Sequence, residues 1–496
     1  MVNYFKISKF FLYLVPFSVV IVSASTLFPF IVGKYVFFRT AVGLALIFFL
    51  LGLLFQSQEV RPPKINGQSW GGRTSQILKS PLVIAVSLFV FIFILAGFFA
   101  VDPAWSFWSN FERGEGGLQM LYFGVFFLLM VLLFKEEKNW RIMFWISIIA
   151  AGLMIFYGLG AGLKYLDAET VIQNIDGIPQ KVLTGKGGSL YQTFKSFIGP
   201  DFRDEGYRFA GSIGNPAYVS VYLIFALFYV FYLLFNRYKQ RMKSFGAIGL
   251  LILAVFFSAF FFLSATRGAF IGLIAAILMS FLYLGFSIKT WRKWLLSGIV
   301  IMLLVIGSLV YFKNAPFIKS LPGSRIFDIS FQTENFQNRM VIWQIAIDGF
   351  KERPLLGWGP ENFSYTFDKH YNPKHYSIIA GFGAWYDRAH NIFLDYLNQA
   401  GILGLLSFLG IFAAFYWCFF KKTLIAANIN TNSREKEKKQ SPITNYQSLI
   451  TNALIFSLPV AYLVQGIVLF DILPTYINLF LFLAFATYKL KADNKI

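Results

Sequence analysis

The sequence predicts an all-α protein that crosses a membrane about twelve times and has one large loop outside the cytoplasm. Of its 496 residues, 57% are hydrophobic, whereas soluble domains have about 45–50% apolar residues. These residues fall in blocks long enough for spanning helices, each of which needs roughly 20 apolar residues. Charged residues make up only 14% of the chain, yet the formal net charge is +20. Together these observations indicate a polytopic membrane protein with basic connecting segments.

The apolar blocks predict spans at 10–30, 36–55, 82–101, 117–134, 142–162, 216–235, 246–264, 268–286, 295–312, 402–420, 447–469 and 474–488. The first block follows Lys6 and Lys9 and ends in Val22-Ser23-Ala24-Ser25, which is similar to a signal peptide. Because many more apolar blocks follow, we expect an uncleaved first helix. With an even number of spans, both termini lie on the same side.

The distribution of Lys and Arg predicts which side that is, because cytoplasmic loops carry the excess of these residues. With both termini in the cytoplasm, the inner connections are 56–81, 135–141, 236–245, 287–294 and 421–446. These segments and the termini hold most of the Lys and Arg and few acids, and the outer segments are close to neutral. The excess of Lys and Arg over Asp and Glu is therefore explained by the orientation of the chain in the membrane. A nucleic-acid partner is excluded, since its site would gather these residues on one face.

Three regions follow from this topology. Residues 1–312 hold nine spans and an extracytoplasmic loop at 163–215. Residues 313–390 form the large extracytoplasmic loop, the longest polar interval of the chain, and we expect it to carry the chemistry. Residues 391–496 hold the last three spans and a cytoplasmic tail.

Four of the arginines on the predicted outer side stand out, because charged groups at a membrane edge are costly and indicate function. They are Arg208, Arg267, Arg339 and Arg388. Arg208 is the first residue of a Gly-rich segment that runs through Asn215 to the expected start of a helix. The N-terminus of a helix favours a bound anion. Guanidinium groups match phosphate oxygens in pairs. The pattern predicts a phosphate site, for which the alternative is that the arginines snorkel or pair with Asp204, Glu205 or Asp387.

His390 is one of only three histidines and closes the large loop in the run Trp385-Tyr386-Asp387-Arg388-Ala389-His390. Imidazole suits a general base near neutral pH. We therefore expect a catalytic or substrate-contacting His390. The alternative is a hydrogen-bonded structural residue at a helix start.

Metal and cofactor chemistry has little support. The chain has no Asp-x-Asp pair and no glycine-rich nucleotide motif followed by Lys-Ser/Thr. Asp201, Asp204 and Glu205 could bind a cation, but a solvated loop is the simpler interpretation. The single cysteine, Cys418, excludes an intramolecular disulfide. We expect no metal and no cofactor, so that an activated lipid diphosphate itself would supply the energy.

Several short motifs occur in an order similar to that of a known family. They are Leu27-Phe-Pro-Phe30, Val101-Asp-Pro103, Ser106-Phe-Trp-Ser-Asn-Phe-Glu-Arg113, Arg208-Phe-Ala-Gly-Ser-Ile-Gly-Asn-Pro216, Ser264-Ala-Thr-Arg-Gly-Ala269, Asn338-Arg339, Pro354-Leu-Leu-Gly-Trp-Gly359 and His390-Asn391. Together they resemble the O-antigen ligase and O-antigen polymerase family of bacterial membrane proteins. Gly114 departs from the family pattern, which has a bulky residue there, and this leaves the role of the neighbouring Glu112 open.

The resemblance implies a C-type glycosyltransferase fold and an undecaprenyl-diphosphate-linked glycan as donor. It implies metal-independent, inverting transfer on the outer face of the bacterial cytoplasmic membrane, to a glycan, a lipid-linked glycan or a protein. Arg208 and Arg267 match the family's membrane-edge arginines, and His390 matches the histidine of its large loop. The candidate substrate-binding residues are Arg339, Arg388, Asp387, Trp385, Tyr386, Asn215 and Glu112.

Two other functions remain open. A transporter or flippase of lipid-linked glycans would show paired charges in mid-membrane or repeated halves, and a non-catalytic component of an envelope assembly complex would need no base. Loss of activity on replacing His390 would argue against both.

Overall fold

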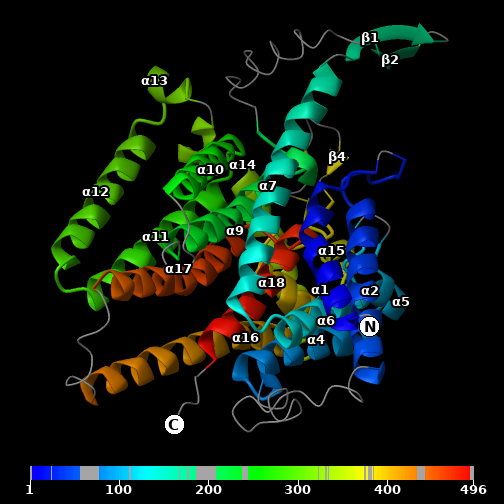
Figure 1. Ribbon diagram of the computed structural model, residues 1–496. Helices are drawn as coiled ribbons and strands as arrows, with labels where there is room; N and C mark the ends of the chain where they lie inside the picture. Colours follow the sequence, from blue (N-terminus) through cyan, green and yellow to red (C-terminus); the bar gives the residue numbers. More distant parts are fainter. Residues whose placement is uncertain are drawn as a thin grey trace.

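The fold was analysed in a computed structural model that describes residues 3–23, 25–55, 77–110, 113–166, 168–175, 178–185, 208–236, 244–321, 323–329, 332, 334–373, 376–377, 382–383, 385–432 and 442–491. The apolar blocks of the sequence are the helices of one bundle (Figure 1). The predicted class, an all-α polytopic membrane protein, is confirmed.

The long apolar segments follow the predicted spans in order. They are α1 (Tyr4–Leu14) with η1 (Val15–Val20), α2 (Val32–Phe55), α4 (Pro81–Phe98), α6 (Gly117–Leu133), α7 (Glu137–Leu166), α9 (Pro216–Phe235), α10 (Ser244–Leu263), α11 (Arg267–Ser287), α12 (Arg292–Tyr311), α16 (Ile392–Asn432), α17 (Pro442–Gly466) and α18 (Leu473–Leu490).

Ten helices in the described part of the chain are long and apolar enough to cross a membrane. The shorter α6 and the pair α1–η1 occupy the remaining two predicted spans. The first span was expected at 10–30, but the helical segment runs from Tyr4 to Val20. Pro16 explains part of this difference, because proline has no N–H for an α-helical hydrogen bond and the chain there takes the tighter 3₁₀ form.

The connections carry shorter elements. These are α5 (Pro103–Trp108), η3 (Gly211–Ile213), α13 (Pro316–Lys319), η4 (Ser324–Phe327), α14 (Glu334–Glu352) and α15 (Phe363–Lys369). Two antiparallel hairpins complete the fold: β1 (Ala168–Ile175) with β2 (Ile178–Gly185), and β3 (Tyr376–Ser377) with β4 (Phe382–Gly383). The first hairpin extends beyond the end of α7, away from the bundle (Figure 1).

Helices α9 and α18 form the centre of the bundle, and nearly all of their residues are buried. Aromatic rings fill the space around them: Phe485 of α18 meets Tyr232 of α9 edge-on at 4.9 Å and Phe144 of α7 at 4.9 Å. Such edge-to-face contacts add to the gain from burial. At the other extreme, α12 has no buried residue and lies at the margin of the bundle (Figure 1).

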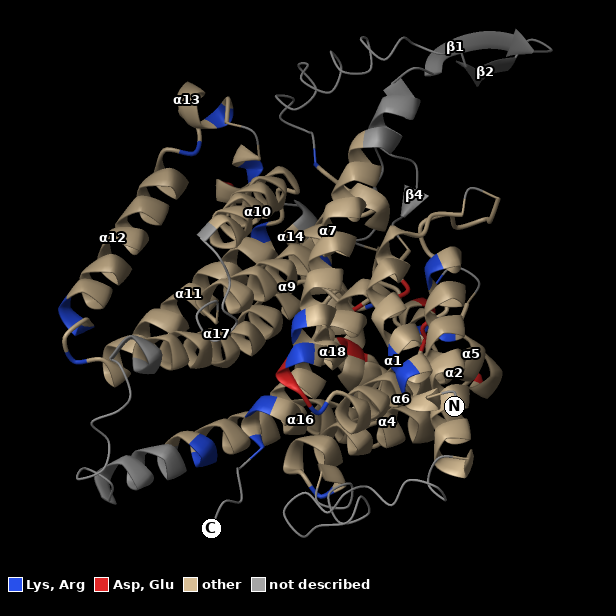
Figure 2. Cartoon of the chain, in the orientation of Figure 1, with Lys and Arg blue, Asp and Glu red and all other residues tan. Residues whose placement is uncertain are grey.

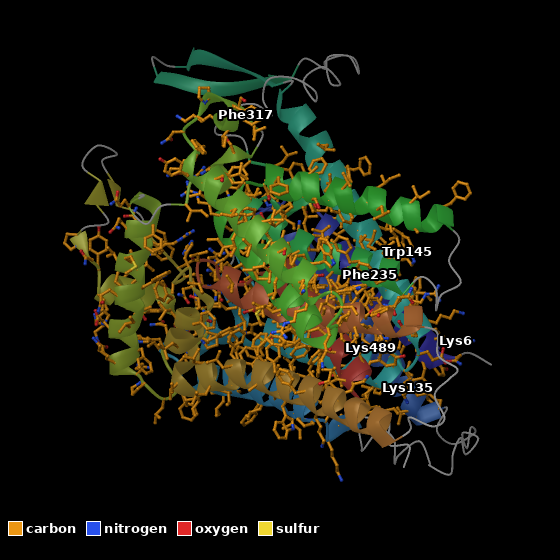
Figure 3. All side chains as sticks on the ribbon, turned by 90° about the vertical axis from the view of Figure 1, so that its left-hand side faces the viewer. Lys6, Lys135, Trp145, Phe235, Phe317 and Lys489 are labelled. Carbon is orange, nitrogen blue, oxygen red and sulfur yellow. The ribbon has the colours of Figure 1, made fainter. Side chains whose placement is uncertain are left out.

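The connections predicted to be cytoplasmic meet at one end of the bundle. Lys489, after the last span, lies 2.7 Å from Glu137 at the start of α7, and the ring of Trp291 stacks on Tyr446 at 5.2 Å. Figure 3 places Lys135 and Lys489 at this end, far from Phe317 of α13 near the top of the view. These contacts bring the end of α18 to the start of α7 and the α11–α12 connection to α17; which side of the membrane they face stays a prediction.

Helix α16 is interrupted at Ala400 and Gly401, where Gly401 has φ +63°. The turn 354–359 pairs with the interruption: Ile402 N donates to Pro354 O at 2.8 Å, and Trp358 N donates to Asn398 O at 2.8 Å. A Cβ on Gly401 would collide with the backbone of Leu355. Glycine is needed here both for the positive φ and for this close approach.

Candidate functional site

A cavity of about 570 Å³ opens where the other set of connections meets. Each connection predicted to be outside contributes to its wall. The wall includes Phe30 from the first, Arg113 from the second, Arg208 from the third, Arg267 from the α10–α11 turn, His390 from the large loop and Phe470 from the α17–α18 connection. Segments far apart in sequence therefore form one site, at the end of the bundle that is predicted to face outward.

The cavity wall is strongly cationic. Six basic side chains line it, namely Lys34, Arg113, Arg208, Arg267, Arg325 and Arg339, against one carboxylate, Glu115. Positive groups that converge on one space repel one another. An arrangement of this kind is stable when an anion occupies the space, and guanidinium groups are best suited to phosphate oxygens.

Arg208 is fixed by the turn that precedes α11. Its Nε donates to Ser264 O at 3.2 Å and its Nη2 donates to Thr266 Oγ1 at 3.0 Å. No carboxylate pairs with it among the described residues. Burial, followed by the positive charges of Arg325, Arg267 and Arg339, lowers the pKa of Arg208 to about 10. The guanidinium stays charged at neutral pH, and no described carboxylate lies within ion-pair distance of it.

The Gly-rich loop after Arg208 is tied to the start of the chain. Gly211 and Gly214 adopt φ +54° and +82°, which glycine allows without strain. The buried Lys34 Nζ donates to Ser212 O at 2.7 Å and to Ile21 O at 2.6 Å. This loop leads into α9, whose first turn is capped by the side chain of Asn215 through a 2.9 Å bond from Ala217 N. These contacts hold the α9 N-terminus at the cavity.

Arg267 is the first residue of α11. Its Nη2 lies 2.7 Å from Asp328 Oδ2, and its Nε donates to Arg325 O at 3.3 Å. No side chain caps the first turn of α11 within the described residues, since the hydroxyl of the N-cap Thr266 binds Arg208 and Pro216 O. Uncapped N–H groups and the helix dipole both favour an anion here.

His390 lies two residues before α16 and reaches the cavity from a backbone with φ +51°. Its ring meets Tyr386 and Phe470 edge-on, at 5.4 Å and 5.0 Å. Its Nδ1 lies 3.1 Å from Arg388 O, which can only accept, so Nδ1 carries the proton and the neutral ring keeps Nε2 as acceptor. Burial, with the nearby Arg339 charge, lowers the pKa of His390 to about 4. At neutral pH this imidazole is uncharged and its Nε2 can accept a proton, but the lowered pKa makes it a weaker base than a free imidazole.

A buried carboxylate cluster, which we define as Glu115, Glu361 and Asp395 around Arg388, adjoins the wall, and its Glu115 also lines the cavity. Arg388 Nη2 contacts Glu361 and lies 3.1 Å from Glu115 Oε2, and its Nη1 lies 3.7 Å from Asp395 Oδ2. In Figure 2 several acidic positions lie together between α2 and α18. Three carboxylates around one guanidinium leave negative charge in excess, and burial raises the pKa of Glu115 to about 7.

Two further groups adjoin this cluster. Arg113 forms a two-pronged ion pair with Asp387, in which Nη2 and Oδ1 lie 2.9 Å apart. Burial raises the pKa of Asp471 to about 8, and its Oδ2 accepts a hydrogen bond from the Tyr462 hydroxyl. Phe470 packs under the guanidinium groups of both Arg113 and Arg388, at 4.8 Å and 5.6 Å from its centroid. Phe470 therefore connects the cluster to His390.

With this geometry in place, the chain was compared with known families. Residues 252–409 match the model of the O-antigen ligase family. The matched residues are called the O-antigen ligase segment below. The resemblance predicted from the sequence is confirmed by that match. The O-antigen ligase segment includes Arg267, Arg325, Arg339 and His390, and Arg208 lies before it. No curated protein matches the chain.

Five of the predicted site residues line this one cavity. They are Arg208, Asn215, Arg267, Arg339 and His390. Arg388 and Asp387 lie in the ion pairs behind the wall. Tyr386 contacts the His390 ring, and Trp385 is exposed, with Nε1 donating to Asp368 at 3.1 Å. Glu112 lies outside the described residues, as do Asp201, Asp204 and Glu205. The substrate contacts of these residues stay predictions.

The sequence analysis did not assign Lys34, Arg113, Glu115 or Arg325 to the site. The first three lie in connections predicted to be outside, where any charged residue could have been counted as a candidate. Arg325 gives no local signal, because nothing in its loop indicates that the chain returns to the cavity. No group of three or more His, Cys, Asp or Glu in the described part of the chain is arranged to hold a metal ion.

Proposed function

We propose that the protein transfers a glycan from an undecaprenyl-diphosphate-linked donor to a hydroxyl group of an acceptor, on the outer face of the bacterial cytoplasmic membrane. The match of residues 252–409 to the O-antigen ligase family supports glycan transfer in polysaccharide assembly. The observation that carries the finer proposal is one cavity that combines unpaired arginines with a neutral imidazole. Arg208, Arg325 and Arg339 have no carboxylate partner among the described residues.

The position of the cavity supports a lipid-linked donor. It lies at the ends of helices that are long and apolar enough to cross a membrane, and α9 and α11 begin there. The lipid chain would stay in the bilayer while the diphosphate enters the cationic wall. An acceptor on a glycan or lipid-linked glycan would approach from the side of the large loop.

The reaction would be a single displacement with inversion at the anomeric carbon. The acceptor oxygen forms a bond to that carbon as the bond from the carbon to the diphosphate oxygen breaks, and the electron pair leaves with the diphosphate. His390 Nε2 takes the proton of the acceptor hydroxyl. Arg208 and Arg267 stabilise the charge that develops on the leaving group, an effect that is usually the largest single contribution to catalysis. No step of this scheme requires a metal or a cofactor.

The test is release of undecaprenyl diphosphate by the purified full-length protein from a labelled lipid-linked glycan, with and without candidate acceptors and with and without EDTA. We expect release that depends on an acceptor and survives EDTA, and that is lost in Arg208→Gln. Lys319→Gln is the matched control, since Lys319 is exposed on α13 and does not line the cavity. Transport of the intact lipid-linked glycan without release would favour a flippase. Binding without either would favour an assembly component.

A further inference from the structure

We propose that residues 313–321 and 323–328, here named the cap, supply Arg325 as a further diphosphate-binding residue, and that Asp328 positions Arg267 for the same ligand. This inference rests on the proposed function. It concerns the segment between α12 and α14, in which the sequence indicated no individual site residue.

The cap is a closed and packed loop. Lys313 Nζ lies 2.7 Å from Asp328 Oδ1 and so joins the two ends of the cap. Ile318, Ile326 and Phe327 are buried, and Phe327 meets Phe270 of α11 edge-on at 5.9 Å. Loops whose ends are close and whose own side chains pack inside them are often functional.

The turn of the cap rests on the end of α10. Gly323 has φ +77°, and a Cβ at this position would collide with Phe262 O. Only glycine allows both the left-handed backbone and this close approach. The turn therefore has a fixed position relative to α10 and α11, and η4, which follows it, brings Arg325 to the cavity wall.

Arg325 has the surroundings of a ligand-binding cation. It lines the cavity, and no carboxylate forms an ion pair with it among the residues described. Three neighbouring arginine charges lower the pKa of Arg208, and the charge of Arg325 has the largest effect of the three. Two guanidinium groups that line one cavity repel each other unless an anion lies between them. A diphosphate has enough oxygens to engage both.

Asp328 holds one side of Arg267. The guanidinium has five N–H donors. Nη2 is engaged by Asp328 and Nε by the backbone oxygen of Arg325. The remaining donors of Arg267, which lines the cavity, stay available for phosphate oxygens. A guanidinium already held in one orientation loses less entropy when the ligand binds.

A competing role for Asp328 predicts the opposite sign. If its carboxylate occupied the place of the phosphate, removing it would free Arg267 and strengthen binding. If it positions Arg267, removing it weakens binding. The sign of the change in affinity therefore separates the two roles.

The experiment measures binding of farnesyl diphosphate and farnesyl monophosphate to the purified full-length protein in nanodiscs, by calorimetry. We expect Arg325→Gln to weaken diphosphate binding by about 10-fold or more, as for a lost charged hydrogen bond, and monophosphate binding by less. Arg325→Lys should recover part of the loss. Lys319→Gln, in the same cap but away from the cavity, should bind as the wild type does.

Asp328→Asn should weaken diphosphate binding by roughly 3- to 10-fold and raise KM for the donor more than it lowers kcat. In an Arg267→Gln background the same change should have little further effect, because Asp328 acts through Arg267. An equal loss in that background, or tighter binding by Asp328→Asn, overturns the positioning role. Wild-type affinity in Arg325→Gln overturns the role of Arg325. If the wild type binds no prenyl diphosphate and releases none, the proposed function itself fails.

Discussion

His390 Nδ1 lies 3.1 Å from the backbone oxygen of Arg388, and this contact decides which ring nitrogen can accept a proton. The Arg388 side chain is held by Glu115, Glu361 and Asp395. The orientation of the candidate base is thus set by ion pairs behind the cavity wall.

Replacing His390 should separate transfer from donor binding. We expect His390→Ala to bind donor nearly as the wild type does and to lose transfer by roughly 10²- to 10⁴-fold, the usual size of a lost general base. His390→Gln keeps a hydrogen-bonding group but cannot take the proton, so it should be nearly as inactive. Donor binding and single-turnover rates measure the two effects. Substantial transfer by His390→Gln would make His390 a structural residue at the start of α16.

The pH profile should follow the lowered pKa of His390. A base with a pKa of about 4 is neutral above that value, so kcat/KM should be flat from pH 6 to 8 and fall as pH approaches 4. A bound diphosphate favours the charged imidazole and should move this fall to higher pH in the kcat profile. The residual activity of His390→Gln should lack the fall. An identical acid limb in that variant would assign the titration to another group.

Arg208→Lys should not be conservative. Lysine keeps the charge but cannot reproduce the planar contacts of Nε with Ser264 O and of Nη2 with Thr266 Oγ1. We expect kcat/KM for the donor to fall by about 10-fold or more, consistent with roughly 1.5–3 kcal/mol for a charged hydrogen bond. Lys289→Arg, at the opposite end of the bundle, is the control. Equal kinetics of Arg208→Lys and wild type would leave Arg208 with a purely electrostatic role.

The raised pKa values of Glu115 and Asp471 predict how stability depends on pH. A carboxyl group whose pKa is higher in the folded state than in the unfolded state stabilises the fold below its unfolded pKa, and this contribution is lost as pH rises through the folded value. Thermal stability in detergent should therefore decrease from about pH 4 and level off above about pH 7 for Glu115 and about pH 8 for Asp471. Glu115→Gln and Asp471→Asn should each flatten the curve, and the exposed Asp348→Asn should not. A stability that rises over this range would contradict the assignment.

Orientation in the membrane can be tested with introduced cysteines. In a Cys418→Ala background, Ser377→Cys should react with an impermeant thiol reagent in whole cells, and Ser433→Cys should react only after the membrane is opened. The reason is the excess of Lys and Arg in the connections predicted to be cytoplasmic. The reverse pattern would place the cavity on the inner face.

The fold was predictable because each spanning helix has a strong local signal, a long apolar block. The error at the first helix arose because hydropathy alone does not register how Pro16 changes the helix type. Arg208, Arg267 and His390 were predictable for a related reason, since charged or titratable groups beside apolar spans are costly and therefore few. These three residues line one cavity because the connections that are predicted to be outside meet at the same end of the bundle.

The remaining parts of the site depend on contacts between distant segments. Glu115 and Arg388 are 273 residues apart in sequence and meet in the buried carboxylate cluster. Asp387 was expected beside substrate, but it pairs with Arg113 of another outer connection. Arg325 reaches the cavity only because the cap folds back over α10. A one-dimensional pattern carries no signal for such long-range pairings.

The interruption of α16 at Gly401 has a consequence for how substrates reach the cavity. A break in a long helix usually permits bending, but here its backbone groups are taken up by residues 354–359, which immediately follow α14. The region after α14 and the membrane-embedded part of α16 are thus joined by backbone hydrogen bonds, and we expect them to move as one rigid body. The large loop should not swing open on this joint. Donor and acceptor would therefore diffuse into a preformed entrance. Solvent viscosity should slow only the diffusion of the substrates to the protein, and it should not change the rate of turnover once they are bound.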